Sequence, residues 1–144
     1  MKVVVQKAIN AKCEVDNKIT GQIANGLIIL VGFTEGDSID SIKYMCKKIV
    51  NLRIFEDNSG IMNKSILDVG GSILSISQFT LYADTSKGNR PSYIKALKAE
   101  EATKLYDLFN EELSNYVKVE KGIFGADMKI TFTNLGPTTI ILER

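Results

Sequence analysis

The alternation of apolar and polar side chains changes phase inside one predicted strand, at residues 72–83. Leu74 and Ile76 are apolar at even positions, whereas Phe79 and Leu81 are apolar at odd positions. Because successive side chains of a strand point to opposite faces, this change requires a bulge or a bend. A bulge turns backbone N–H groups out of the ladder and is common beside active sites. A plain strand that passes from one sheet into another gives the same pattern, so both interpretations stay open.

Length and composition limit the fold and the location. The chain has 144 residues, 44% hydrophobic and 24% charged, which is typical of one globular domain with a sizeable core. No run of about 18 apolar residues exists, and lysines interrupt the N-terminus too early for a secretory signal. We therefore expect a single domain over residues 1–144, in the cytoplasm and without a membrane segment. Cys13 and Cys46 match no metal-ligand spacing and are expected to be buried thiols, so no metal is predicted.

The sequence contains no histidine. This excludes Ser-His-Asp and Cys-His catalytic arrangements and all zinc or iron sites that use histidine. An enzyme with this sequence has to use backbone N–H groups, hydroxyls, carboxylates, lysine or groups of its substrate, and we expect no cofactor. The formal charge of +1 gives no overall attraction for a polyanion, so contact with nucleic acid depends on local charge.

Strand and helix patterns alternate along the whole chain. Residues 27–33 are apolar on both faces, as expected of a central strand, and the Asn25-Gly26 pair before them predicts a turn. Asp37 is the expected cap of a first helix, and residues 99–116 form a second amphipathic helix. The other predicted strands are residues 2–9, 11–16, 19–23, 52–55, 117–122, 128–133 and 138–142. We predict an α+β fold in which mostly antiparallel, barrel-like sheets pack with two main helices.

Two segments stand out as candidate functional loops. Between Asp84 and Glu100 lie four cations and no acidic residue: Lys87, Arg90, Lys95 and Lys98. This surplus is a candidate phosphate contact, although a solvated basic loop explains it as well. Pro137 lies between two predicted strands, and because proline cannot donate to a ladder we place it in a turn at residues 134–137. The local sequence favours an ordinary trans peptide bond before Pro137.

Two motifs resemble the signatures of the D-aminoacyl-tRNA deacylases. Residues 77–81 read Ser-Gln-Phe-Thr-Leu, like the family's SQFTL, and residues 134–139 read Asn-Leu-Gly-Pro-Thr-Thr, like its NxGPxT. Other segments that resemble the family lie in order at residues 53–55, 88–92 and 124–128. The resemblance covers the whole chain and has no departure inside the motifs.

This resemblance implies a homodimer that hydrolyses the ester between a D-amino acid, or glycine, and the terminal ribose of tRNA. Each active site of the family lies at the dimer interface, where one subunit's SQFTL segment meets a cis Gly-Pro dipeptide of the other. The dipeptide would hold the substrate's α-ammonium with its carbonyls and exclude an L side chain. The implied catalytic residues are Ser77, Gln78, Phe79 and Thr80; the implied substrate-binding residues are Gly136, Pro137, Met128 and Phe124; and the implied tRNA contacts are Lys87 and Arg90.

The chemistry agrees with this assignment. An aminoacyl ester is already activated, so orientation of the attacking oxygen and N–H donors at the developing oxyanion can suffice. We expect the N–H groups of Phe79 and Thr80 to be these donors. The Thr80 hydroxyl is either a nucleophile or a positioning group, and with no base in view we expect the second.

Two alternative functions agree with the sequence as well. A non-enzymatic RNA-binding module would use the basic loop and show no turnover, whereas a hydrolase of other small esters or amides would not need that loop. Release of amino acid from matched D- and L-aminoacyl-tRNA distinguishes them.

Overall fold

Two long strands, β1 (Lys2–Val15) and β2 (Lys18–Gly32), form the centre of the structure, a computed structural model that describes residues 1–144. They pair antiparallel, and β7 (Lys129–Glu143) pairs antiparallel with the outer edge of β1. On the other side β5 (Ser72–Ser77) and β6 (Val119–Lys121) are added in parallel, giving the order β6-β5-β2-β1-β7. The predicted α+β fold is confirmed, but the β2–β5–β6 part of the sheet is parallel.

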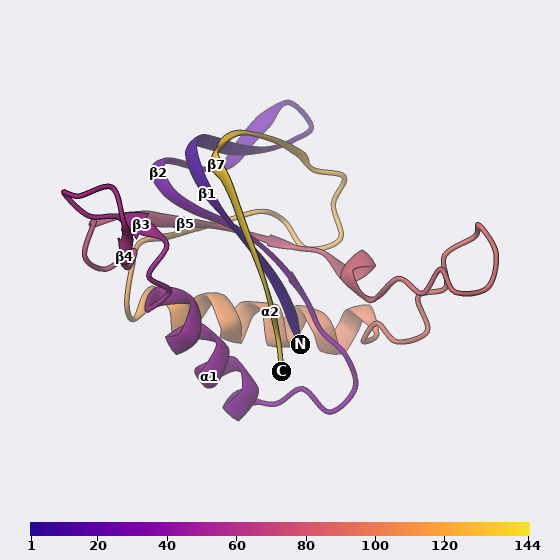
Figure 1. Ribbon diagram of the computed structural model, residues 1–144. Helices are drawn as coiled ribbons and strands as arrows, with labels where there is room; N and C mark the ends of the chain where they lie inside the picture. Colours follow the sequence, from indigo (N-terminus) through magenta and orange to yellow (C-terminus); the bar gives the residue numbers. More distant parts are fainter.

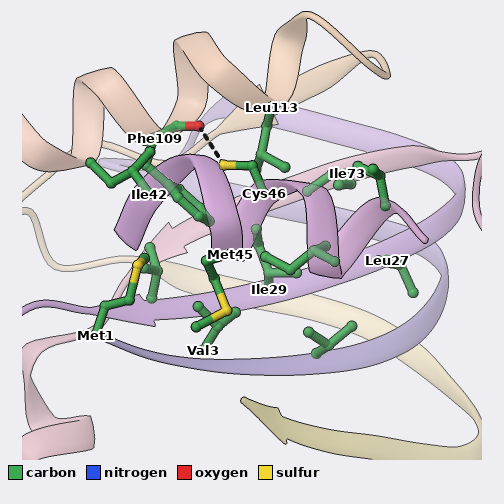
Figure 2. Packing of buried hydrophobic residues seen from close by; sticks show 14 of the residues in the cluster. Met1, Val3, Leu27, Ile29, Ile42, Met45, Cys46, Ile73, Phe109 and Leu113 are labelled. Carbon is green, nitrogen blue, oxygen red and sulfur yellow. Dashed lines mark hydrogen bonds between the residues drawn. The ribbon is translucent and has the colours of Figure 1, made fainter. Parts of the chain in front are cut away.

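Helices α1 (Ile39–Val50) and α2 (Ala99–Ser114) supply the main core against this sheet (Figure 1). Figure 2 shows apolar side chains of both helices meeting those of β1, β2 and β5. The Cys46 thiol lies 3.6 Å from the Phe109 carbonyl oxygen, and burial raises the pKa of this thiol to about 12. Both cysteines are buried and free, as predicted. None of the helices is both long and apolar enough to cross a membrane.

The cap of α1 differs from the prediction. Ser38, not Asp37, is the N-cap, and it forms a capping box with Ser41. The Asp37 carboxylate instead accepts the Thr34 N–H at 2.8 Å and pairs with the amino group of Met1 at 2.6 Å. Asp37 therefore fixes the N-terminal end of β1 beside the loop that precedes α1.

Neither of the two predicted turns reverses the chain. Strand β2 runs through Asn25-Gly26, and a Cβ on Gly26 would lie 1.9 Å from the Ser72 carbonyl oxygen. Glycine is needed there because β5 approaches closely, not because the chain turns. At residues 134–137 β7 continues past a bulge, since segments on both sides of it pair with β1. The predicted strands 128–133 and 138–142 are therefore one strand.

The phase change lies where the chain leaves the sheet. Strand β5 ends at Ser77, and Phe79–Tyr82 forms the short 3-10 helix η1. The prediction of one strand through residue 83 is wrong, because the odd-numbered apolar side chains belong to the 3-10 turn. The predicted strand at residues 52–55 is reduced to β3 (Phe55–Glu56), which forms a small hairpin with β4 (Met62–Lys64).

Candidate active site

The backbone after β5 presents free N–H groups. The Gln78 N–H donates to the Val31 carbonyl at 2.7 Å, the last bond between β2 and this segment, and η1 begins at the next residue. The first N–H groups of a helix have no partner within it, and no turn, loop or side-chain hydrogen bond uses the N–H of Phe79 or Thr80. Two adjacent donors are therefore available to a ligand.

A glycine on β2 allows η1 to lie this close to the sheet. A Cβ on Gly32 would lie 2.8 Å from the Gln78 carbonyl oxygen and 3.3 Å from the Cβ of Leu81. Any larger residue at position 32 would push the turn that carries the free N–H groups away from β2. Gly32 is thus part of what positions the site.

The Thr80 hydroxyl has an amide as its neighbour. The side-chain Nε2 of Gln78 donates a hydrogen bond to Thr80 Oγ1, and no carboxylate, lysine or arginine is bonded to this oxygen. The hydroxyl lacks a base that could activate it. The Phe79 ring beside it is 56% exposed and packs edge-to-face with Tyr93, with ring centroids 5.1 Å apart.

Two cavities meet at this turn. The first, which we call the Met128 cavity, has a volume of about 270 Å³ and is lined by Ile76, Ser77, Gln78, Phe79, Phe124, Gly125, Ala126, Asp127, Met128 and Ile130. The second, the Leu97 cavity, has about 290 Å³ and is almost entirely apolar. Both are bordered by Gln78, Phe79 and Phe124. The structure thus brings together five residues that the sequence assigned to the site: Ser77, Gln78, Phe79, Phe124 and Met128.

Helix α2 supports the far wall of the Met128 cavity. The Tyr106 ring packs against Phe124 with centroids 5.9 Å apart, and its hydroxyl donates to the Ser75 carbonyl at 2.9 Å. Burial raises the pKa of this hydroxyl. Gly122 lies so close to Met128 that a Cβ there would be 2.5 Å from the sulfur. The segment at residues 122–128 is therefore held against β5 from both sides.

Gly136 and Pro137 do not reach these cavities within one chain. They lie in the bulge of β7 at the outer edge of the sheet, and β1 and β2 separate β7 from β5. The Gly136–Pro137 peptide bond is cis, as the family resemblance implies and contrary to the expectation from the residues alone.

Lys87 and Arg90 lie in a loop that projects from the body of the molecule after η1 (Figure 1). Asp84 and Ser92 bridge the base of this loop through backbone hydrogen bonds of 2.8 and 2.9 Å. Hydrogen bonds from Ser86, helped by Lys95 at 3.4 Å, lower the pKa of the Asp84 carboxyl to about 2. One of the four predicted cations, Lys95, is thus paired, and the loop's surplus of positive charge is smaller than the sequence suggested.

Comparison with known proteins decides the family. A model of the D-Tyr-tRNA(Tyr) deacylase family matches residues 4–143. The chain belongs to this family. It is therefore a D-aminoacyl-tRNA deacylase, a hydrolase that cleaves the ester bond of D-aminoacyl-tRNA.

Two solved structures are similar to the deacylase over nearly their whole length. One, described as a c-Myc DNA unwinding element binding protein, is 38% identical with a TM-score of 0.94, covering 100% of this chain and 99% of that one. The other, a probable eukaryotic D-amino acid tRNA deacylase, is 17% identical with a TM-score of 0.83, covering 98% and 97%. At that identity the second match supports the fold alone.

Several residues that line or support the candidate site were not predicted from the sequence. Leu97 reaches the second cavity because its N–H donates to the Phe33 carbonyl at 2.9 Å, a contact between distant segments that no local pattern signals. Asp127 is the one ionisable side chain that lines the Met128 cavity. Gly32 had a weak signal, since it interrupts the apolar run at residues 27–33.

Proposed function

We propose that this deacylase performs chiral proofreading in translation, in the cytoplasm: it releases D-amino acids, and glycine from tRNA on which it is mischarged, and rejects L-aminoacyl-tRNA. The observation that carries the proposal is the pair of free N–H groups of Phe79 and Thr80 at the edge of a cavity. Such a pair is suited to an oxyanion. Without histidine, this is the strongest catalytic feature that the chain offers.

The reaction needs little more than orientation. Water, oriented by groups that include the neighbouring ribose hydroxyl, adds to the ester carbonyl, and the two N–H groups stabilise the resulting oxyanion. The bond to the ribose oxygen then breaks, and that oxygen takes the proton which the attacking oxygen loses. Ser77 and Gln78 position the ester, and Thr80 helps to hold the Gln78 side chain through their hydrogen bond. Thr80 acts as a positioning residue, because no base lies next to its hydroxyl.

A second copy of the chain supplies the rest of the site. Gly136 and Pro137 are exposed on the outer edge strand, where Ile141 is also 67% exposed. In a homodimer with twofold symmetry, this edge of each subunit can insert the dipeptide into the Met128 cavity of the other. The Met128 cavity of each subunit is then completed by the partner.

Selection against L substrates is steric in this arrangement. The carbonyls of Gly136 and Pro137 hold the α-ammonium, so an L side chain projects into fixed backbone while a D side chain projects away. Overlap with backbone discriminates more strongly than the roughly 1–3 kcal/mol that one methylene in a pocket supplies. Glycine has no side chain and passes the same barrier.

The direct test is single-turnover release of amino acid from D-Tyr-tRNA, L-Tyr-tRNA and glycyl-tRNA by the purified protein. We expect rapid release from the D and glycyl substrates and none above background from the L substrate. Equal release of D- and L-tyrosine would contradict chiral proofreading while leaving the esterase chemistry intact.

The deacylase is expected to be a dimer at micromolar concentration, because a monomer would leave Gly136 and Pro137 away from the cavity. Light scattering gives the mass directly, against the 15.9 kDa of one chain. A monomer with full activity would show that the site does not need a partner.

Replacing both Lys87 and Arg90 with alanine should weaken tRNA binding without changing the ratio of D to L turnover. Each phosphate contact that is lost should lower the slope of log K against log salt by roughly one. Filter binding over a salt series measures the slope, and Lys47 and Lys48, exposed on α1, provide a matched double-alanine control. A collapse of selectivity in the loop variant would mean that the loop contacts the amino acid.

A further inference from the structure

The bulge of β7 is closed at its base by two ladder residues. Thr139 pairs with Gln6 of β1, and Asn134 pairs with Ala8. Lys7 is therefore the only residue of β1 that lies opposite residues 135–138 of β7 in the ladder. Gly136 and Pro137 lie inside this stretch, so the backbone that carries them has no ladder partners to orient it.

One hydroxyl connects the two ends of the bulge to its centre. Thr139 Oγ1 accepts from Gln6 Nε2 at 3.2 Å and from Asn134 Nδ2 at 3.4 Å, and it donates to the Pro137 carbonyl at 3.3 Å. A hydroxyl has two acceptor lone pairs and one proton. Since two amides occupy the acceptor sites, the proton is directed at the Pro137 carbonyl oxygen.

We propose that Thr139, held by Gln6 and Asn134, is a positioning residue that orients the Pro137 carbonyl toward the substrate's α-ammonium and so sets the chiral selectivity of the enzyme. The inference rests on the proposed function of Gly136 and Pro137. A carbonyl oxygen has two lone pairs, so Pro137 can accept the Thr139 hydroxyl and a substrate N–H together. The hydroxyl touches no reacting atom and acts only through this carbonyl.

We call the hydrogen-bonded group of Gln6, Asn134 and Thr139 the clasp. Variants of its residues are expected to lose activity to different degrees. Thr139→Val keeps the shape of the side chain and removes the hydroxyl, and we expect kcat/KM for D-Tyr-tRNA to fall roughly five- to tenfold, as for loss of one or two hydrogen bonds, mainly through KM. The ratio of D to L turnover should fall as well. Thr139→Ser should restore both, and Gln6→Leu should give a smaller loss in the same direction.

Thr133→Val is the matched control, because Thr133 is exposed on the same strand and its hydroxyl makes no hydrogen bond to the bulge. Thermal unfolding of each variant separates a loss of fold from a loss of orientation. Wild-type kinetics in Thr139→Val, or equal losses in Thr139→Val and Thr139→Ser, would overturn the clasp.

A parallel measurement on Gly136→Ala distinguishes a failure of the clasp from a failure of the proposed function. Loss of selectivity in Gly136→Ala with none in Thr139→Val overturns the clasp alone. Unchanged selectivity in both variants overturns the proposed function, and the clasp with it.

Discussion

Phe79→Pro is expected to lower the rate of D-aminoacyl-tRNA deacylation by roughly 100- to 1,000-fold, because it deletes one of the two N–H donors at the oxyanion. The substitution suits the local backbone. Phe79 is the first residue of η1, a position where proline is tolerated, and Gln78 before it, with φ −146° and ψ 85°, lies outside the α region that a following proline disfavours. Single-turnover deacylation of D-Tyr-tRNA measures the effect, with tRNA binding and thermal unfolding as checks that the protein is intact.

Two controls isolate the N–H group from the side chains. Phe79→Ala removes the ring that packs on Tyr93 but keeps the donor, so it should retain most of the catalytic rate. Thr80→Ala removes the hydroxyl and keeps the second donor, and it should retain measurable D-specific activity. Complete inactivity of Thr80→Ala, with fold and tRNA binding unchanged, would instead identify a threonine nucleophile.

Local patterns in the sequence predicted the elements whose contacts are local or periodic. All but the last residue of the doubly apolar stretch 27–33 lies in the central strand β2, and the predicted second helix matches α2 to within two residues at its C-terminal end. The Asn25-Gly26 turn failed because the need for glycine there comes from Ser72, far along the chain. An Asn-Gly pair signals a hairpin only when no such close approach explains it.

The alternation of side chains led to the candidate site for a partly wrong reason. The phase change at Ser77 marks freed N–H groups, as expected of a bulge, but a 3-10 turn frees them. The alternation of side chains indicates only that the strand ladder is interrupted, and a bulge and a 3-10 turn both interrupt it. The motifs then identified Phe124 and Met128, whereas Leu97 was not predictable, since only the tertiary fold brings it to Phe79.

Membership of the deacylase family also decides between the alternatives that the sequence left open. A binding module without turnover would not need two adjacent free N–H groups beside a cavity, and it does not agree with the family match over residues 4–143. The small surplus of positive charge, with Lys95 paired to Asp84, suits an enzyme that contacts few phosphates of its tRNA.

Gly136→Ala is expected to reduce D-specific deacylation by roughly 100-fold, the effect of displacing a positioning group by about 1 Å. Gly136 has a φ of +109°, and an added Cβ would lie 2.6 Å from Thr138 Oγ1 and 2.8 Å from its backbone nitrogen. The backbone at Gly136 and Pro137 must therefore move, and their carbonyls with it. Gly60→Ala is the control, because Gly60 also has a positive φ of +75° but lies in open space in the β3–β4 hairpin.

Mixed dimers show whether the displaced carbonyls act in their own subunit or in the partner. A dimer of one Phe79→Pro chain and one Gly136→Ala chain combines both defects in one interface site and leaves the other site with a wild-type turn and a wild-type dipeptide. Purified through two different tags, it should recover about half of the wild-type activity, although each parent homodimer is nearly inactive. If each site were built within a single chain, every site of the mixed dimer would carry one defect and no activity would return. Recovery therefore requires that Gly136 and Pro137 work in the partner's cavity, the arrangement that we propose because β1 and β2 separate them from Ser77 within one chain.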